Sequence, residues 1–236
     1  LILSVFSIVT AHPFKSEKEL YEYYAEIDKK IFAEKNKPII RKKYPRKLTD
    51  KELEQEQIPF SLKRYTVDEI VGNNKLVYNA FNYQLMSISQ INENNKEEGV
   101  IRTFDEDENL ISIAYIENSK GVMGIYREYY PWGVLKNETP YYTSEINGKL
   151  KNYYPDGLLK EEYTYYNNKK EGLATMYYES GQKFAIENYK NDLKNGDYYM
   201  YYENGTLGMK AFFVNGKREG TIEFYEEDGK KIEKNK

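Results

Sequence analysis

Cysteine is absent from this chain of 236 residues, and histidine and tryptophan occur once each. Without cysteine, these residues offer no disulfide, thiol nucleophile or thiolate metal ligand. His12, the single histidine, has no second imidazole with which to build a metal site or a catalytic relay. The phosphate-binding, dinucleotide-binding and serine-hydrolase glycine motifs are also missing. We therefore expect no catalytic, cofactor-binding or metal-binding residues, and we predict that the protein is not an enzyme.

Positive charge is not in excess, since the formal net charge is −3 at pH 7. A chain without a basic field has little attraction for nucleic acid, so we predict no nucleic-acid partner. The sequence is polar, with a mean hydropathy of −0.84, yet 16% of its residues are aromatic and 26 are tyrosine. Disordered chains are poor in aromatic residues. Because tyrosine joins an apolar ring to a hydroxyl that stays hydrated, the composition favours a thin folded structure.

The first eleven residues, 1–11, form an uncharged apolar run. A helix that spans a bilayer needs about 20 residues, so this run is too short. Its length is typical of the apolar region of a secretory signal, with Val9 and Ala11 at the −3 and −1 positions of a cleavage site. We interpret it as a signal peptide with a truncated start, which predicts export to the periplasm, the cell envelope or the medium. A buried N-terminal strand and an uncleaved anchor are the alternatives.

Residues 12–75 predict a short helical region followed by a linker. Ser16 and Glu19 form a capping-box pattern, after which apolar residues recur at helical spacing and Pro38 stops the helix. We therefore expect a helix over about 16–35. The basic stretch 35–47 is either a patch for an anionic surface or a solvated linker, and the linker is favoured. A second capping box at Thr49 predicts another short helix, which ends before Pro59.

Glycine shows the first sign of a tandem repeat, because ten of the 15 glycines fall on two columns with a 24-residue period. One column comprises Gly133, Gly157, Gly181, Gly205 and Gly229. The other comprises Gly124, Gly148, Gly172, Gly196 and Gly220. Since glycine readily adopts the positive φ angles of tight turns, we interpret both columns as turn glycines of the repeat.

Aromatic residues add a 12-residue period inside the 24-residue repeat. Nine consecutive positions of this series are aromatic: Tyr129, Tyr141, Tyr153, Tyr165, Tyr177, Tyr189, Tyr201, Phe213 and Tyr225. Each 24-residue unit therefore consists of two similar halves, each a strand and a turn. Successive turns of a meander lie on opposite edges, so the series should form two aromatic rows, one along each edge. These nine residues are the candidate interaction surface.

The segments between the turns favour β-strands. Residues 149–154 and 158–166 are rich in tyrosine and leucine, which suit a pleated surface. Asn147-Gly148 and Asn195-Gly196 are typical hairpin signals. We therefore predict a mostly β fold, an elongated antiparallel sheet of tandem hairpin repeats. It should occupy residues 76–236 as six or seven units, after the short helical region.

The repeat resembles a known family. Asn147-Gly148-Lys149 is followed by Tyr153-Tyr154 and Gly157, and the same pattern returns from Gly172, Gly196 and Gly220. This pattern closely resembles the MORN repeat in its bacterial variant form, and chains built this way are similar to the YwqK-family antitoxins. The resemblance implies elongated antiparallel sheets that contact other proteins, with lipid contact for some members.

Other chemical signals are weak. Asp105, Asp107 and Asn109 match the start of a calcium loop, but Leu110 and Ile116 stand where its glycine and its bidentate glutamate belong. An acidic hairpin turn is the favoured interpretation. The carboxylates of Glu161 and Glu162 are the best pair for an enzyme, yet nothing distinguishes them from other charged strand residues. The tyrosine pairs could stack on sugars or bases, but a packing seam between strands is favoured.

The function predicted from the sequence is that of an exported, non-enzymatic repeat scaffold, which binds another protein through a tyrosine-rich sheet surface. The alternatives are an antitoxin-like partner of a toxin protein and a cell-envelope module that binds glycan or lipid. Aromatic glycan and choline modules rely on tryptophan cages, which Trp132 alone does not supply. Weak contact with a membrane surface stays open, and open sheet edges favour a homodimer.

Overall fold

The computed structural model describes residues 14–42, 51, 66–80, 82–117 and 120–233. The predicted signal segment 1–11, His12, the basic residues after Lys42 and the predicted second short helix lie outside the described residues, Lys51 excepted. The chain divides into two compact units: residues 22–135, called the first unit, and residues 1–21 with 136–236, called the second unit. Each unit is mostly β and antiparallel, which confirms the predicted fold class.

The N-terminal helix α1 extends over Glu17–Lys35, as predicted. Ser16 Oγ accepts a hydrogen bond from the Glu19 N–H (3.2 Å), and Glu19 Oε2 accepts one from the Lys15 N–H (2.7 Å). These two bonds satisfy backbone donors that a helix N-terminus leaves unpaired. The capping box therefore sets the start of α1, and the helix ends three residues before Pro38.

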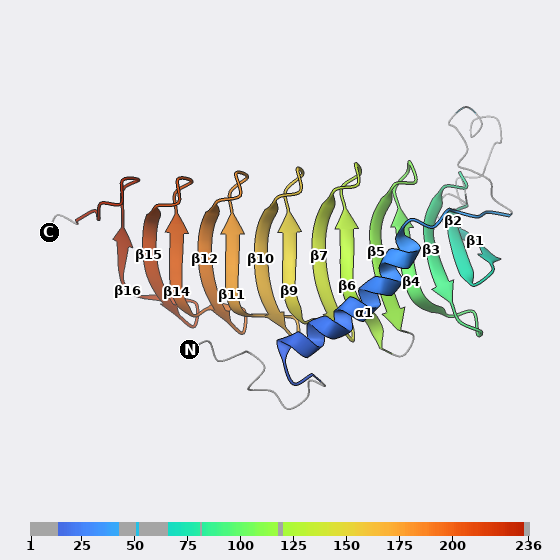
Figure 1. Ribbon diagram of the computed structural model, residues 1–236, viewed down its shortest axis with the longest axis horizontal. Helices are drawn as coiled ribbons and strands as arrows, with labels where there is room; N and C mark the ends of the chain where they lie inside the picture. Colours follow the sequence, from blue (N-terminus) through green and yellow to red (C-terminus); the bar gives the residue numbers. More distant parts are fainter. Residues whose placement is uncertain (1–13, 43–50, 52–65, 81, 118–119, 234–236) are drawn as a thin grey trace. The chain divides into compact units, whose positions relative to one another are not determined.

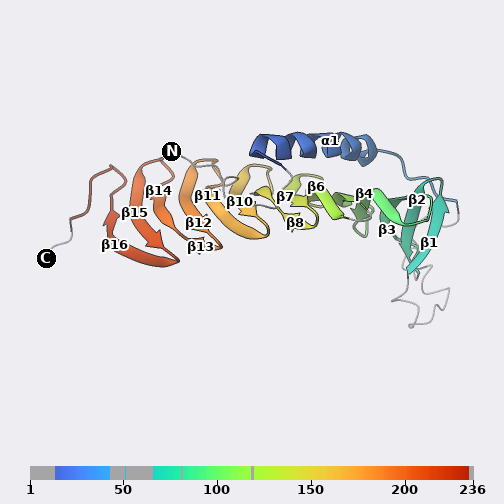
Figure 2. The ribbon, with the colours of Figure 1, turned by 90° about the horizontal axis from the view of Figure 1, so that it is seen from below.

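The described residues of the first unit form six strands, each hydrogen-bonded to the next along the chain (Figure 1). They are β1 (Thr66–Val71), β2 (Asn74–Asn79), β3 (Leu85–Ile91), β4 (Glu97–Phe104), β5 (Leu110–Glu117) and β6 (Gly121–Tyr129). One cluster of its core consists of Leu76, Tyr78, Leu85 and Ile88. Within this unit, α1 from Glu22 onward lies over one face of β4–β6, as Figure 2 shows. Ile27 and Ile31 of the helix are buried there, as are Ile113 and Met123 of the strands.

The second unit repeats the same hairpin. Its sheet has the strand order β7-β9-β10-β11-β12-β14-β15-β16, with the two-residue strands β8 and β13 paired to β7 and β12. The bounds are β7 (Leu135–Tyr142), β8 (Glu145–Ile146), β9 (Gly148–Tyr153), β10 (Leu159–Tyr166), β11 (Lys169–Tyr177), β12 (Lys183–Lys190), β13 (Leu193–Lys194), β14 (Gly196–Tyr201), β15 (Leu207–Val214) and β16 (Lys217–Phe224). Two strands for every 24 residues agree with the predicted two-part unit.

The two glycine columns have different roles, and this corrects one prediction. Gly133, Gly157, Gly181, Gly205 and Gly229 lie in turns with φ between 83° and 93°, as expected. The second column instead lies within strands or at their first residue, as at Gly148 (φ 114°) and Gly196 (φ 122°). The hairpin turns come earlier, at pairs such as Thr143-Ser144 and Asn167-Asn168, where both residues have positive φ. Such two-residue turns twist in the sense that paired strands require, so Asn147-Gly148 is left as an irregularity in the ladder.

Candidate interaction surface

One face of the first unit's sheet is covered by α1, and we call it the helix-side face. Directly paired residues form a row across it: Ile88, Arg102, Ile113 and Arg127. Every member of this row is buried, and Ile113 is 0% exposed. The row is a continuous floor on which the amphipathic helix rests.

The helix contacts this floor through charge as well as apolar packing. Arg127 donates from Nη1 and Nη2 to Asp28 Oδ1 and Oδ2, both at 2.8 Å, in a bidentate pair. Lys35 Nζ lies 4.2 Å from the ring centroid of Tyr129. Lysine ammonium groups are attracted to the negative face of an aromatic ring at such distances. In the first unit, therefore, a lysine of α1 lies over the ring of Tyr129, one of the predicted aromatic positions.

The repeat gives the second unit an equivalent face. A shift of 24 residues takes Arg127 to Lys151, Thr175, Tyr199 and Glu223 in turn. All four belong to one directly paired row across the sheet: Glu138, Lys151, Glu162, Thr175, Ile186, Tyr199, Lys210 and Glu223. This row is the helix-side face of the second unit.

Tyr21, in the first turns of α1, marks the same face within the second unit. Its hydroxyl oxygen accepts a hydrogen bond from the Lys149 N–H at 2.8 Å. Burial, and then the nearby carboxylates of Glu17, Glu162 and Glu138, raise the pKa of Tyr21 to about 12, against the lowering effect of the Lys149 hydrogen bond. The helix therefore contacts this face at β9.

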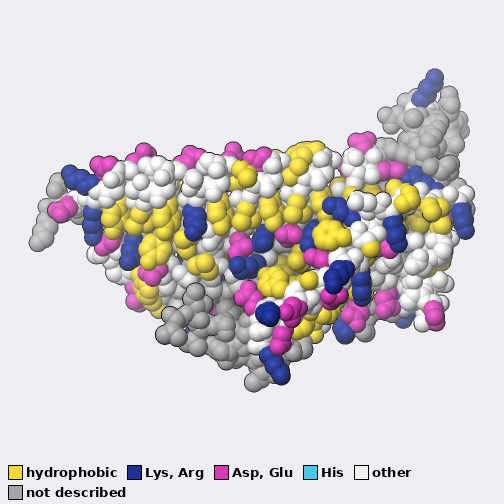
Figure 3. All heavy atoms as spheres, viewed as in Figure 1, with side chains coloured by type: hydrophobic (Ala, Val, Ile, Leu, Met, Phe, Trp, Pro, Cys, Tyr) yellow, Lys and Arg dark blue, Asp and Glu magenta, His cyan; other side chains and the backbone are white. Residues whose placement is uncertain are grey.

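Farther along the second unit, apolar side chains of the helix-side face are open to solvent. Leu173 pairs with Asn188 and is 51% exposed, and Phe212 pairs with Asp197 and is 44% exposed. Figure 3 shows a band of hydrophobic side chains, tyrosine included, across β9–β16 on this face. Acidic side chains line the edge above the band, where the glycine turns lie. This face thus offers apolar rings beside a negative rim.

The first predicted aromatic row is Tyr129, Tyr153, Tyr177, Tyr201 and Tyr225. Its members in the second unit lie at the ends of strands, beside the glycine turns, and are half-buried. The Tyr153 hydroxyl donates to Glu138 Oε2 (2.8 Å), and the Tyr225 hydroxyl donates to Glu223 Oε2 (2.7 Å). Since Glu138 and Glu223 belong to the row above, these tyrosines lie on the helix-side face.

The second predicted row, Tyr141, Tyr165, Tyr189 and Phe213, lies near the opposite ends of the strands and on the other face of the sheet. Three of its rings stand opposite glycines of the second column: Tyr165 opposite Gly148, Tyr189 opposite Gly172 and Phe213 opposite Gly196. A glycine partner leaves room for a ring to lie across the neighbouring strand. The second glycine column is therefore explained by packing rather than by turns.

The other face of the second unit is filled by its own side chains. Ala174, Ala185 and Ala211 are buried there beneath aromatic rings. Tyr163 meets Tyr189 edge to face at 6.3 Å, and Lys170 Nζ lies 3.7 Å from the centroid of the Tyr163 ring. Burial raises the pKa of both tyrosines, and carboxylates raise it further, that of Glu161 at Tyr163 and that of Glu187 at Tyr189. Alanines and half-buried aromatic rings thus fill this face, which leaves the helix-side face as the candidate surface.

A ladder of tyrosine hydroxyls joins one repeat to the next, and the sequence reasoning missed it. Tyr154, Tyr178 and Tyr202 donate to the carbonyl oxygens of Tyr177, Tyr201 and Tyr225, at 2.7, 2.8 and 2.9 Å. Each donor is the second member of a Tyr-Tyr pair, so the pairing was the available signal. The first tyrosine of a pair faces the helix side, and the second fastens the edge.

The other edge has its own ladder. Asn147 Oδ1 accepts from the Asn167 N–H (3.0 Å), Glu171 Oε2 from the Asn191 N–H (2.8 Å), and Asn195 Oδ1 from the Asn215 N–H (3.2 Å). Each bond connects a residue just before a second-column glycine to a turn of the following hairpin. Both edges are thereby held, which keeps the open face between them regular.

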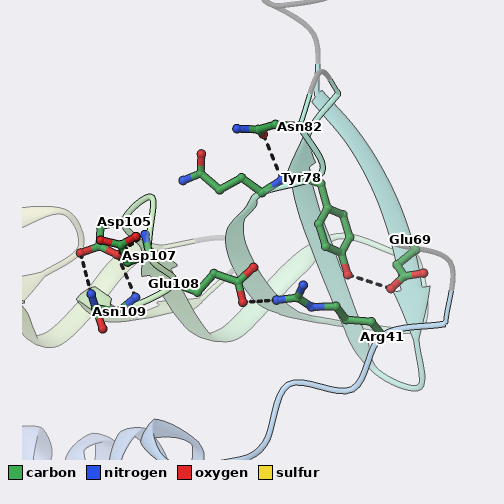
Figure 4. A network of polar contacts seen from close by, with 9 residues as sticks. Arg41, Glu69, Tyr78, Asn82, Asp105, Asp107, Glu108 and Asn109 are labelled. Carbon is green, nitrogen blue, oxygen red and sulfur yellow. Dashed lines mark hydrogen bonds and ion pairs between the residues drawn. The ribbon is translucent and has the colours of Figure 1, made fainter. Parts of the chain in front are cut away.

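The acidic residues that are candidates for calcium binding or catalysis have structural partners. Figure 4 shows Asp105 accepting from its own loop, with Oδ1 bound by the N–H groups of Asp107 (3.0 Å) and Asn109 (2.8 Å). In the same view, Arg41 pairs with Glu108, and the Tyr78 hydroxyl donates to Glu69 Oε1 (2.8 Å). Among the described residues, no group of three or more histidines and carboxylates is placed to hold a metal ion.

Glu161 and Glu162 do not form a pair. Glu161 accepts from Asn152 Nδ2 (2.7 Å) on the filled face, whereas Glu162 meets Lys149 Nζ (2.9 Å) on the helix-side face. Neighbouring residues of a strand point to opposite faces, which accounts for the separation. As for membranes, α1 is the long helix of the described residues, and it is not apolar enough to cross a bilayer.

Comparison with known proteins finds a family match within the repeat. Residues 146–168, 170–191 and 194–215 match the family model of the MORN repeat variant. These three segments coincide with the hairpins β9–β10, β11–β12 and β14–β15. MORN repeats are typically protein- or membrane-interaction modules. No curated protein sequence matches the chain.

Solved structures add no functional argument. The crystal structure of TarM has 11% sequence identity to this chain, a TM-score of 0.21 and coverage of 86% of this chain. A mutant of S. aureus TarM in complex with fondaparinux, alpha-GlcNAc-glycerol and UDP also has 11% identity and 86% coverage, with a TM-score of 0.18. This chain spans 28% and 29% of those two chains. Likenesses this distant carry no inference.

Proposed function

We propose that the protein is a non-enzymatic scaffold that binds another protein through the helix-side face of its second unit. One observation carries the proposal: the 24-residue repeat gives the second unit a face equivalent to the one that α1 covers in the first, and Leu173 and Phe212 are about half-exposed on it. Monomeric proteins rarely expose large contiguous apolar patches unless these patches bind something. The MORN-variant match over residues 146–215 supports an interaction role.

A membrane surface is a weaker candidate than a protein. Lys37 and Arg41 of the basic stretch are already paired, with Glu34 (Nζ to Oε1, 2.5 Å) and with Glu108. Charges that are neutralised in this way contribute little to attraction by anionic lipid. Glycan binding in an aromatic cage is disfavoured too, because such cages rely on several tryptophan rings and Trp132 is the single tryptophan.

The proposal keeps the export predicted from residues 1–11, so the partner is sought in the cell envelope or the medium. Affinity capture with the full chain is compared with capture by a Tyr199→Asp, Phe212→Asp variant. The control is Ile70→Asp, which alters a 51% exposed isoleucine of β1, outside the second unit. A purified partner should bind saturably to the native chain and the control, and at least tenfold more weakly to the surface variant. Equal binding to the native chain and to the surface variant would overturn the proposal. The absence of a saturable partner at micromolar concentration would overturn it as well.

A further inference from the structure

The structure indicates what kind of element the open face accepts, because the chain covers the equivalent face itself. In the first unit the cover is an amphipathic helix with Tyr24, Ile27 and Ile31 buried against the sheet. The spacing of these residues places one apolar stripe along the helix. A partner that uses the same floor therefore needs such a stripe.

The repeat makes the two floors comparable residue by residue. Gly124 leaves room for the helix, since a Cβ added there would come within 2.5 Å of Ile27 Cγ2. Gly148 is its equivalent, and a Cβ there would lie 3.0 Å from the Tyr21 hydroxyl. Gly220 belongs to the same column, and a Cβ there meets nothing within 4 Å. Along the repeat, the second glycine column therefore passes from positions that residues of α1 cover to a position with open space above it.

Charge specifies the partner further. Residues 171–233 carry 8 Lys/Arg against 12 Asp/Glu, a net charge of −4. Burial, and then the carboxylates of Glu203 and Glu227, raise the pKa of Tyr178, at the edge where the tyrosine row ends. In the first unit the corresponding edge receives Lys35 over the Tyr129 ring at 4.2 Å. An ammonium or guanidinium group on the partner would find both a ring face and a carboxylate there.

We infer that the helix-side face of β11–β16 binds a basic amphipathic α-helix of a partner protein, with an apolar stripe on the sheet and Lys or Arg toward the glycine-turn edge. This inference rests on the proposed function and names the element that the partner presents. Thr175, Ile186 and Tyr199 form the centre of the floor, with Tyr177 and Tyr201 at the basic end of the helix. Leu173 and Phe212 bound the floor on the other side.

The test uses the full chain and a defined probe, a lactam-bridged helical peptide with the sequence of residues 17–37 and the changes Glu22→Lys and Glu26→Lys. Residues 17–37 hold 5 Lys against 6 Asp/Glu, and the two changes at exposed positions off the apolar stripe give 7 against 4, a net charge of +3. It is labelled with a fluorophore and carries a photoreactive group at the position of Phe32. Fluorescence anisotropy should show saturable binding, at least tenfold weaker for the Tyr199→Asp, Phe212→Asp variant and unchanged for Ile70→Asp. A peptide with Ile27→Asp and Ile31→Asp should not bind, and Lys30→Glu with Lys35→Glu should weaken binding at least tenfold. Cross-links should fall within residues 171–225.

Cross-links confined to residues 74–129 would mean that the peptide replaces α1, and would overturn the inference. Absence of binding up to about 1 mM peptide would overturn it as well. The two proposals fail separately. If a captured partner requires Tyr199 and Phe212 but the peptide does not bind, the scaffold proposal stands and the helix inference fails. Failure of both capture and peptide removes both.

Discussion

The two units share a hairpin repeat and differ in what lies on its helix-side face. In the first unit the row from Ile88 to Arg127 is buried beneath α1, whereas the equivalent row of the second unit ends with Tyr199, Lys210 and Glu223 partly in water. The residue types follow this difference, since Ile113 and Met123 give way to tyrosine and charged side chains. The repeat thus determines the backbone conformation of both units, and the presence or absence of α1 determines which side chains are buried.

The largest contrast is expected from isoleucines in the two rows. Ile113→Ala should lower the free energy of unfolding by about 2–5 kcal/mol, because a fully buried site leaves a cavity. Ile186→Ala, in the partly exposed row, should cost less than about half as much. Urea denaturation of the full chain measures both. Equal losses would mean that the second face is covered as well as the first.

The glycine column gives a matched pair. Gly124 (φ 77°) and Gly220 (φ 71°) share a left-handed backbone, so alanine strains both by about 1–2 kcal/mol. Gly124→Ala also meets Ile27 Cγ2 at 2.5 Å, and the overlap should raise its total cost to about 2–4 kcal/mol. Denaturation curves of the two variants give the difference. If Gly220→Ala were as costly, the helix contact would not be the cause.

The ion pair beneath α1 should matter more than one on its outer surface. Asp28→Ala leaves Arg127 buried without its bidentate partner, and should cost about 2–3 kcal/mol. Glu26→Ala breaks an exposed pair with Lys29 and should cost no more than about 0.5 kcal/mol. Thermal denaturation at low and high salt compares them. A similar, salt-sensitive loss for both would place Arg127 in solvent.

The smallest effect concerns alkaline pH. Tyrosine in the unfolded chain loses its proton near pH 10, whereas folded Tyr21 holds it up to a pKa of about 12. Folding therefore binds a proton above pH 10, and stability should fall as pH rises from 10 to 12. Tyr21→Phe removes that contribution, so its stability should fall less steeply with pH. Denaturation at several pH values checks the slope, and identical slopes would show that Tyr21 is not buried at Lys149.

Much of the fold could be predicted because its signals are local. The 24-residue glycine period and the 12-residue aromatic period predicted two strands per unit, and Ser16 with Glu19 predicted the start of α1. The second glycine column was misassigned because Asn147-Gly148 has the composition of a turn, while the strand register places the turn at Thr143-Ser144. A dipeptide pattern does not contain that register.

The candidate surface was predicted only in part. The sequence predicts the nine aromatic positions, but it does not show that Tyr177 and Tyr189 lie on opposite faces, or that one face is filled by its own rings. The stripe of Tyr24, Ile27 and Ile31 predicted a buried helix face without indicating its floor. Both depend on contacts between distant segments, such as Asp28 with Arg127, which periodicity alone does not determine.

The most direct test of the contrast between the units is hydroxyl-radical footprinting of the full chain, read by mass spectrometry. Leu173 and Phe212 should be oxidised at least several times faster than Ile113 and Leu76, which α1 and the strands bury. Adding the helical peptide should slow the oxidation of Leu173 and Phe212 and leave the oxidation of Ile70, which is 51% exposed in β1, unchanged. Protection of Leu173 and Phe212 in the free chain, equal to that of Ile113, would contradict an open face in the second unit.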